Sequence, residues 1–215
     1  MLRAYFTEYS IDDDVALVIL TNAYHSSSDF AEQVTALATE WNLNLHQLPK
    51  VIFHPKVAQQ ELPQLFKAAH AFVLPSRGEG WGRPHVEAMA MGLPVIATNW
   101  SGPTEYLKPH NGYPLPILPA LVPVPASSAF VGHLWADPDH EALRELIRHV
   151  QNNREEAVAK GIQARVDMIE KYSPAALAER TGELLRDLVG GATPSGKRKE
   201  RSVVGGDSST NRREL

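Results

Sequence analysis

Two glutamates eight positions apart, Glu79 and Glu87, flank a glycine-rich stretch suited to a phosphorylated ligand rich in hydroxyl groups. Glycines at positions 78, 80 and 82 free the backbone from side-chain obstruction, and Pro84 suits the first position of a helix. We therefore expect a helix that begins at Arg83 or Pro84. The amino end of a helix exposes unpaired N–H groups and a partial positive charge, which favour a diphosphate. Glu79 and Glu87 are then placed to accept hydrogen bonds from sugar and ribose hydroxyls on either side of it.

A purely structural interpretation of the same residues is also open. A glutamate in the first turns of a helix opposes the helix dipole favourably without any ligand, which alone accounts for Glu87. A glycine-rich turn between a strand and a helix is common in α/β folds, and such a motif by itself is weak evidence for binding.

The elements that position these residues follow from alternating apolar runs and helical periodicity. Strands are predicted at 15–21, 50–54, 71–75 and 94–98, with a short strand near Tyr113. Helices are predicted at 29–41, 61–69, from Arg83 or Pro84 to Met91, and at 103–107, 140–152, 155–171 and 174–189. Strands alternating with helices indicate an α/β fold with a Rossmann-like, doubly wound parallel sheet and helices at the C-terminal end. Ligands of such sheets bind at the carboxyl ends of strands, where the Glu79 loop lies.

Individual positions in these elements carry more specific expectations. The apolar run 15–21 is typical of a strand buried on both faces of a parallel sheet. Leu62, Leu65, Phe66 and Ala69 are spaced to face the sheet. Asp139 and Ser173 are predicted helix caps, and Ser101 is a third candidate cap, with contact to the ligand as the alternative for its short helix.

Three further stretches extend the pattern around the glutamates: His70–Ser76, Glu87–Thr98 and Ser101–Leu107. Together with Glu79–Gly82 they closely resemble the donor half of family 4 glycosyltransferases, and the likeness continues in looser form over residues 1–188. The resemblance implies a GT-B architecture, in which two Rossmann-like domains face one another across a cleft and the C-terminal one holds a nucleotide diphosphate sugar. It also implies retaining, metal-independent transfer of a hexose, with no cofactor besides the donor itself.

Carried over residue by residue, the resemblance assigns Glu79 to the hydroxyls of the donor sugar and Glu87 to the ribose. Gly80, Trp81 and Gly82 are implied to offer backbone amides to the sugar, and amides near Gly82 and Arg83 to meet the diphosphate. Arg83 stands where relatives often carry an apolar residue, so it is either an extra cation for the diphosphate or a solvated side chain. No catalytic residue is assigned.

Relatives of this kind also use an arginine and a lysine from an early strand-to-helix loop, which the sequence does not contain. Met1–Ser10 resembles the helix that follows that loop, so we expect the first strand, its basic pair and the acceptor-binding domain to lie outside this sequence. Two functions are therefore open: the donor-binding domain of a transferase acting on an unidentified sugar, lipid or protein, or a non-catalytic module that binds nucleotide sugars or a partner.

Composition favours one folded domain over residues 1–189, since 43% of the 215 residues are hydrophobic and 21% are charged. There is no cysteine, which excludes disulfides and thiolate metal sites, and the nine histidines include no i, i+4 pair typical of zinc sites. No stretch approaches the ~20 apolar residues of a membrane helix. We expect a cytoplasmic protein with at most peripheral membrane contact.

Two segments depart from the domain pattern. Residues 109–133 contain six prolines and are predicted to form a long extended loop, either lining the cleft or solvated. Residues 190–215 are rich in Gly, Ser and charged side chains and are predicted to be a disordered tail. The tail has six basic and three acidic residues, so it carries +3 and the rest of the chain −7 of the net −4. An acidic body argues against nucleic acid as a partner.

Overall fold

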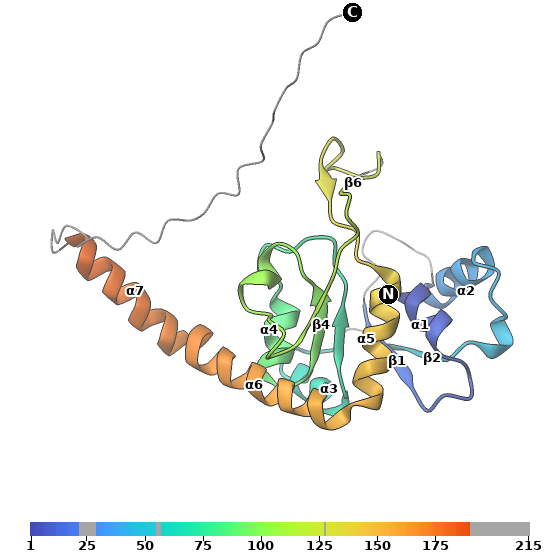
Figure 1. Cartoon of the computed structure of the whole chain (residues 1–215), viewed down its shortest axis with the longest axis horizontal. Helices are drawn as coiled ribbons and strands as arrows, with labels where there is room; N and C mark the ends of the chain where they lie inside the picture. Colours follow the sequence, from blue (N-terminus) through green and yellow to red (C-terminus); the bar gives the residue numbers. More distant parts are fainter. Residues whose placement is uncertain (22–28, 55–56, 127, 190–215) are drawn as a thin grey trace, which may run out of the picture. The chain divides into compact units, whose positions relative to one another are not determined.

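The structure is a computed structural model, and it describes residues 1–21, 29–54, 57–126 and 128–189. Strands and helices alternate along the chain as the sequence predicts (Figure 1). The strands are β1 (Ala16–Leu20), β2 (Lys50–His54), β3 (Phe72–Leu74), β4 (Val95–Thr98), β5 (Tyr113–Leu115), β6 (Val122–Pro123) and β7 (Leu134–Trp135). The α-helices are α1 (Leu2–Glu8), α2 (Phe30–Glu40), α3 (Leu62–Ala68), α4 (Arg83–Ala90), α5 (His140–Asn152), α6 (Arg154–Tyr172) and α7 (Pro174–Val189), and the 3₁₀ helices are η1 (Leu45–Gln47) and η2 (Gly102–Glu105).

The first five strands pair in parallel, which confirms the predicted α/β class with parallel strands and flanking helices. Their hydrogen bonds divide them into two ladders, one with the order β1-β2 and one with the order β3-β4-β5. In the second ladder Phe72 is opposite Val95, and Ile96 is opposite Tyr113. In the described residues β1 and β3 do not pair, so no hydrogen bonds between strands join the two ladders.

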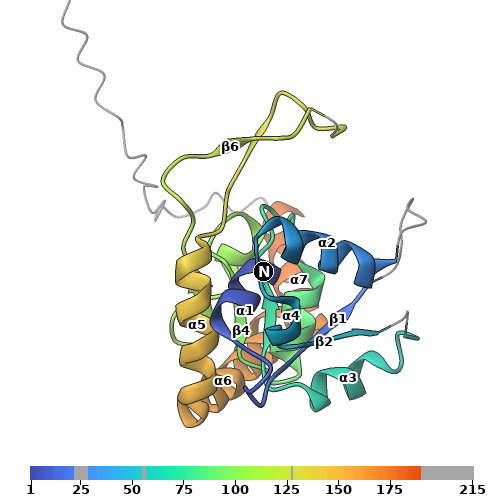
Figure 2. The ribbon, with the colours of Figure 1, turned by 90° about the vertical axis from the view of Figure 1, so that its right-hand side faces the viewer.

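The expectation that 15–21 is buried on both faces is wrong for β1. Its residues alternate between exposed and half-buried, and Val18 and Leu20 are 43% and 40% exposed. Only one face of β1 is covered, by residues such as Tyr5, Phe6 and Ala38 from the helices α1 and α2. Figure 2 shows α2 and α3 on opposite sides of the β1-β2 pair. In α3 the side chains of Leu62, Leu65 and Phe66 are half-buried as predicted, but Ala69 is exposed.

The densest part of the core surrounds β4, all four residues of which are buried. Met89 of α4, Val95 and Ala97 of β4 and Met168 of α6 form a cluster on one face of the second ladder. On its other face, Ile96 and Leu115 pack with Leu143 of α5 and with Ala4 of α1. Burying the larger of these side chains, those of Met, Val, Ile and Leu, contributes roughly 1.5–3 kcal/mol each and fixes the ends of the strands from which the site loops emerge.

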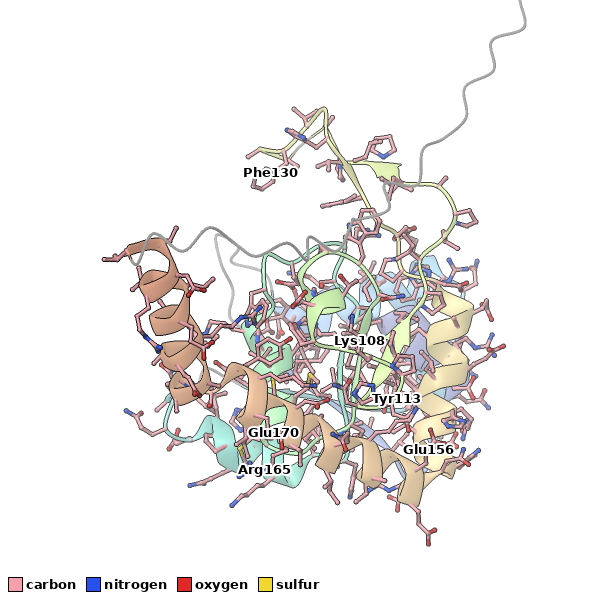
Figure 3. The ribbon with its side chains drawn as sticks, turned by 60° about the vertical axis from the view of Figure 1, so that its left-hand side comes forward. Lys108, Tyr113, Phe130, Glu156, Arg165 and Glu170 are labelled. Atoms are coloured by element: carbon pink, nitrogen blue, oxygen red, sulfur yellow. The ribbon has the colours of Figure 1, made fainter. Side chains whose placement is uncertain are left out.

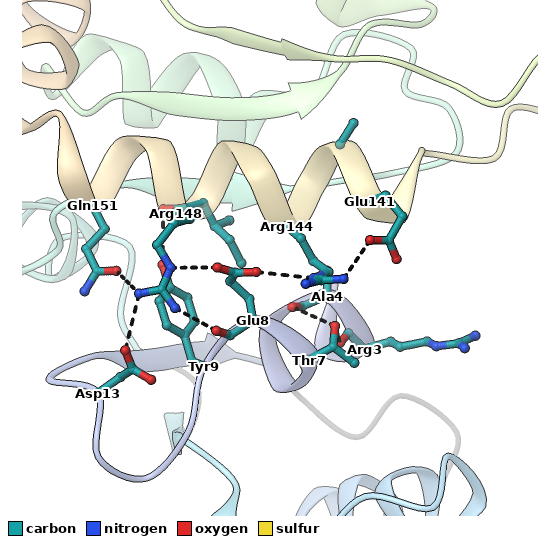
Figure 4. A network of polar contacts seen from close by, with 12 residues as sticks. Arg3, Ala4, Thr7, Glu8, Tyr9, Asp13, Glu141, Arg144, Arg148 and Gln151 are labelled. Atoms are coloured by element: carbon teal, nitrogen blue, oxygen red, sulfur yellow. Dashed lines mark hydrogen bonds and ion pairs between the residues drawn. The ribbon is translucent and has the colours of Figure 1, made fainter.

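An ionic network holds α1 against α5 (Figure 4). Arg148 donates to the carboxylate of Glu8 at 2.6 Å and to its backbone carbonyl at 2.7 Å, and it stacks over the ring of Tyr9. Arg144 binds the same carboxylate at 3.2 Å, and Asp13 accepts from Arg148 at 3.3 Å. The Glu8 side chain is only 15% exposed and pairs with both guanidinium groups, so removing either arginine would leave a largely buried carboxylate with fewer partners.

Helix α6 approaches the end of α4 through two glycines. A Cβ atom on Gly161 would lie 2.2 Å from the carbonyl oxygen of Gly92, so only glycine fits there. Gly92 itself has a φ of 78° and follows the last turn of α4. The side chain of Arg165 also donates to the carbonyl of Ala90. This contact fixes α4, and with it the loop that precedes α4.

The segment 109–133 contains more structure than predicted. The strand near Tyr113 is confirmed as β5, but β6 and β7 form an additional antiparallel pair, with Val122 opposite Trp135. The arm they form extends away from the rest of the first unit (Figures 1 and 2). Phe130 lies near its end and is 69% exposed (Figure 3). Short strands joined through proline-rich sequence lack the alternating pattern that identifies longer strands, which is why they were not predicted.

The remaining helices agree closely with the sequence. Asp139 caps α5 by accepting hydrogen bonds from the amides of Glu141 and Ala142, and Ser173 accepts from the amide of Ala176 at the start of α7. Met1–Ala176 forms one compact unit, and a second begins at Leu177 and contains the rest of α7. The predicted tail at 190–215 lies outside the described residues.

Candidate functional site

The loop between β3 and α4 has the geometry that its glycines predict. Helix α4 begins at Arg83, as expected, and its cap residue Gly82 has φ 86° and ψ 61°. A Cβ on Gly82 would lie 2.5 Å from Nδ1 of His85 and 2.8 Å from the hydroxyl of Tyr106. Glycine is therefore required at position 82 both for its left-handed backbone and for space.

A second loop, which follows β4, holds the Glu79 segment in place. The amide of Glu79 donates to Oγ of Ser101 at 2.9 Å, and the amide of Gly102 donates to the carbonyl of Glu79 at 2.9 Å. A Cβ on Gly102 would lie 2.4 Å from the carbonyl oxygen of Gly80. Ser101 occupies the cap position of η2 but its side chain makes no capping bond. The predicted cap is thus wrong in its role, because the hydroxyl binds the Glu79 loop instead.

His85 joins the strand to the helix. It is fully buried, with Nδ1 3.2 Å from the carbonyl oxygen of Gly82 and Nε2 3.3 Å from that of Leu74. Its ring also packs edge-on against Phe72. A packed imidazole with both nitrogens facing backbone carbonyls has a structural role at the start of α4.

Arg83 and Glu87 bind each other in this structure. Nη2 of Arg83 lies 2.9 Å from Oε1 of Glu87, and their side chains are 73% and 35% exposed. An exposed pair at this spacing contributes about 0.3–0.5 kcal/mol, so a ligand can replace it at little cost. Glu79 is half-buried and lies on the loop before α4, and Glu87 lies in the second turn of the helix.

An aromatic cluster beneath the loop was not identified from the sequence. The Tyr106 hydroxyl donates to the carbonyl of Trp81 at 2.6 Å and lies 3.4 Å from that of Gly82. The ring of Trp81 packs against Tyr106 at 5.0 Å and against Tyr172 at 5.4 Å between centroids. Burial, the nearby Glu79 carboxylate and Tyr172 raise the pKa of Tyr106 above its usual value, so the hydroxyl stays a donor. Tyr172 comes from α6, far along the chain, and no local pattern could reveal this contact.

The buried carboxylate of Asp167 is linked to the backbone of Tyr106 through Asn111. Asn111 donates to the backbone carbonyl of Tyr106 at 3.0 Å and to Oδ2 of Asp167 at 2.6 Å. Asp167 is 4% exposed and also accepts from Lys171 at 2.8 Å and from His110 at 3.1 Å. Burial alone would raise its pKa, but these donors outweigh burial and lower the pKa of Asp167 to about 2.

Free backbone donors gather at the point where the ligand is expected. Within the described parts of the chain, the amides of Gly80, Trp81 and Gly82 donate no hydrogen bond, whereas the carbonyls of Trp81 and Gly82 are occupied by Tyr106. Such amides, next to the positive end of α4, suit phosphate or hydroxyl oxygens. The arrangement can thus hold an anion between two carboxylates that accept from hydroxyls.

The described residues contain neither a cluster suited to a metal ion nor a helix suited to crossing a membrane. In those residues no three His, Asp or Glu side chains are grouped so that they could hold a metal ion. None of the described helices combines the length and the apolar character that crossing a bilayer requires.

A parallel α/β unit with a glycine-capped loop at the carboxyl edge of its strands has the arrangement in which open α/β sheets bind their ligands. Residues 35–167 match the family described as Glycosyl transferases group 1, and the chain belongs to this family. A segment of 53 residues is 45% identical to mannosylfructose-phosphate synthase of Agrobacterium fabrum and covers 25% of this chain and 12% of that protein.

Solved structures share the fold. HepE of Anabaena in complex with UDP superposes with a TM-score of 0.64 at 19% identity, over 86% of this chain and 44% of that chain. The C-terminal domain of the glycosyl transferase group 1 protein LpcC of Francisella tularensis gives a TM-score of 0.57 at 20% identity, over 80% of this chain and 77% of that chain. The chain thus corresponds to less than half the length of HepE and agrees in extent with a C-terminal domain of this family.

Proposed function

We propose that the chain binds a nucleotide diphosphate sugar at the loop between β3 and α4, as the donor-binding domain of a family 4 glycosyltransferase with a GT-B fold. In this proposal Glu79, with the amides of Gly80, Trp81 and Gly82, holds the sugar. Glu87 holds the ribose, and Gly82 and Arg83 hold the diphosphate. The enzyme would transfer a hexose with retention to a sugar, lipid or protein acceptor, without a metal ion, in the cytoplasm.

The observation that carries this proposal is the glycine-capped start of α4, with Glu79 on the loop before it and Glu87 in the second turn of the helix. The free amides of the loop provide donors for oxygens of the ligand, and the glutamates provide acceptors for its hydroxyls. Family membership supports the same ligand class, and a structural neighbour, HepE, was crystallised with UDP. Glu79 and Glu87 would position the donor rather than act as acid and base.

Calorimetry with UDP, GDP and ADP, and then with the corresponding sugars, tests the binding. We expect one of the three diphosphates to bind measurably. The substitution Glu79→Gln should lower the affinity for the sugar nucleotide more than the affinity for the free diphosphate, since Glu79 is assigned to the sugar. Glu170→Gln, an exposed glutamate on α6, is the matched control. If no diphosphate or sugar nucleotide gives heat or a thermal shift, the proposal is wrong.

A non-catalytic binding module remains the second candidate, because the donor site described above contains groups that position a ligand and no assigned catalytic residue. Both candidates predict binding, and they differ in turnover. Release of free diphosphate from the preferred sugar nucleotide, measured with and without a panel of simple acceptors, separates them: turnover that depends on Glu79 supports the transferase, and binding without turnover supports the module.

A further inference from the structure

Ser101, in the loop after β4, has a backbone conformation that suits glycine and strains other residues. Its φ is 54° and its ψ is −140°, close to the mirror image of the ordinary extended conformation. Glycine enters this region freely, whereas a residue with a Cβ is strained there. In the described part of the chain, Asn42 is the one further non-glycine residue with a positive φ, and asparagine tolerates it better. Strain of this kind persists only where the surrounding structure holds it.

Backbone contacts around Ser101 hold this conformation. Its carbonyl accepts hydrogen bonds from the amide of Thr104 at 3.0 Å and from Oγ1 of the same threonine at 2.7 Å. The next residue, Gly102, donates its amide to the carbonyl of Glu79 at 2.9 Å and packs directly on the backbone of Gly80. None of these contacts uses the serine side chain. A glycine at position 101 would therefore keep all of them.

The serine hydroxyl adds one contact that glycine could not make, and it acts on the donor loop. Oγ of Ser101 accepts from the amide of Glu79 at 2.9 Å, while Gly102 binds the Glu79 carbonyl. The two bonds hold the peptide groups on both sides of the Glu79 Cα, and so they fix the direction in which its side chain leaves the backbone. Because the neighbours Gly78 and Gly80 leave these peptide groups free to rotate, the hydroxyl bond is needed to hold the first of them.

We propose that Ser101 is a positioning residue for the donor sugar: its hydroxyl keeps the Glu79 carboxylate directed at the sugar, in a backbone conformation that glycine would adopt with less strain. The proposal rests on the proposed function, in which Glu79 binds the sugar hydroxyls. It follows that stability and sugar binding should respond differently to substitutions at position 101, because the strain comes from the Cβ and the positioning comes from the hydroxyl.

The test compares two variants that both lack the hydroxyl. Ser101→Gly relieves the backbone, whereas Ser101→Ala keeps a Cβ in the strained conformation. The matched control is Ser128→Ala, since the Ser128 hydroxyl also accepts from a backbone amide, that of Phe130, but lies in the arm formed by β6 and β7. Thermal unfolding gives the Tm of each protein. Calorimetry gives its affinity for UDP, GDP and ADP and for UDP-glucose, GDP-mannose and ADP-glucose.

We expect Ser101→Gly to unfold several degrees above Ser101→Ala, because glycine relieves the strain. Despite this difference in stability, both variants should bind the preferred sugar nucleotide about fivefold more weakly than the unmodified chain, as the loss of one hydrogen bond implies. Their affinity for the free diphosphate should change less than about twofold. The control variant should keep both affinities.

A double-mutant cycle shows whether Ser101 acts through Glu79. In the Glu79→Gln background, Ser101→Ala should cause no further loss of sugar-nucleotide affinity, because the group that it positions has already been altered. Additive losses would overturn the proposal, as would equal Tm values for the glycine and alanine variants or a sugar affinity that one of them retains. If the unmodified chain binds no probe, the proposed function fails together with this proposal. If it binds and both variants keep the sugar affinity, this proposal alone is wrong.

Discussion

Arg83 and Glu87, four residues apart at the start of α4, are joined at 2.9 Å, although each is assigned to a different part of the ligand. The ion pair keeps the Glu87 carboxylate directed along the helix surface. It also means that binding exchanges one set of partners for another: Glu87 would accept from ribose hydroxyls as Arg83 is released toward the diphosphate. Variants of the two residues therefore separate the two assignments.

Replacing Glu87 tests the ribose contact. In this and the following predictions UDP stands for whichever of UDP, GDP and ADP the chain binds. Glu87→Gln keeps the size of the side chain but removes its charge, so we expect UDP to bind about tenfold more weakly, since a hydrogen bond to a charged group contributes about 1.5–3 kcal/mol. The ratio between UDP and 2′-deoxy-UDP should also fall, because the variant loses its preference for the ribose hydroxyl. Calorimetry measures both, with Glu170→Gln as the control. Unchanged affinity together with an unchanged ratio would contradict the assignment.

Replacing Arg83 distinguishes a diphosphate contact from a solvated side chain. Arg83→Met keeps much of the apolar stem and removes the cation, and we expect UDP affinity at low salt to fall about fivefold. At 0.5 M salt the difference from the unmodified chain should shrink, because screening weakens the Arg83 contribution. An affinity for UDP that is the same in both proteins at every salt concentration would show that Arg83 is only solvated.

The Tyr106 hydroxyl is expected to hold the loop through the carbonyl of Trp81. In Tyr106→Phe that carbonyl loses its donor, which costs about 1–3 kcal/mol and lowers Tm by a few degrees. UDP binding should weaken too, because the loop is less well ordered. Tyr113→Phe is the control, since its hydroxyl makes only a 3.5 Å contact with Glu156. Equal effects of the two substitutions on Tm would argue against a special role for Tyr106.

The lowered pKa of Asp167 predicts that the protein loses stability in acid. Its pKa in the folded protein is lowered from 3.8 to about 2, so its contribution is complete above pH ~4 and is lost as the pH falls toward 2. The shift corresponds to on the order of 2 kcal/mol. Urea unfolding at pH 5 and at pH 2.5 measures it: the stability difference between the unmodified chain and Asp167→Asn should shrink at the lower pH. A constant difference would contradict the prediction.

A pair of glycine substitutions tests the α4–α6 contact. Alanine normally favours a helix over glycine by about 0.8–1 kcal/mol, and Gly182→Ala in α7 should follow this rule because its nearest neighbour is the flexible end of Arg186 at 3.8 Å. Gly161→Ala should instead destabilise the protein, since its Cβ would press on the backbone of Gly92. Thermal unfolding compares the two variants. A higher Tm for Gly161→Ala would mean that the helices can separate freely.

Local patterns predicted the elements that position the site. The start of α4, the cap at Asp139 and the parallel strands were all predicted, because glycine, proline and capping residues act within a few positions of the chain. The sequence could not show that Tyr172 packs on Trp81 or that Asp167 supports Tyr106 through Asn111. These contacts join residues more than fifty positions apart and depend on how α6 packs.

The expectations that failed share a physical reason. β1 has the apolar composition of a central strand, but burial on both faces depends on neighbours that its own sequence does not specify. Ser101 has the residue type and position of a cap, but its hydroxyl oxygen accepts a hydrogen bond from the Glu79 amide and does not cap the helix. In both cases tertiary contacts decided between alternatives that are locally equivalent.

The close approach of Gly102 to the Glu79–Gly80 backbone has a consequence for protein engineering. Because there is no room for a Cβ between the two loops, neither main chain can be lengthened or rebuilt without displacing the other. Libraries that seek altered ligand selectivity should therefore leave both loop lengths unchanged. Variation is best confined to exposed side chains such as Trp81 and Arg83, whose replacement leaves that backbone contact intact.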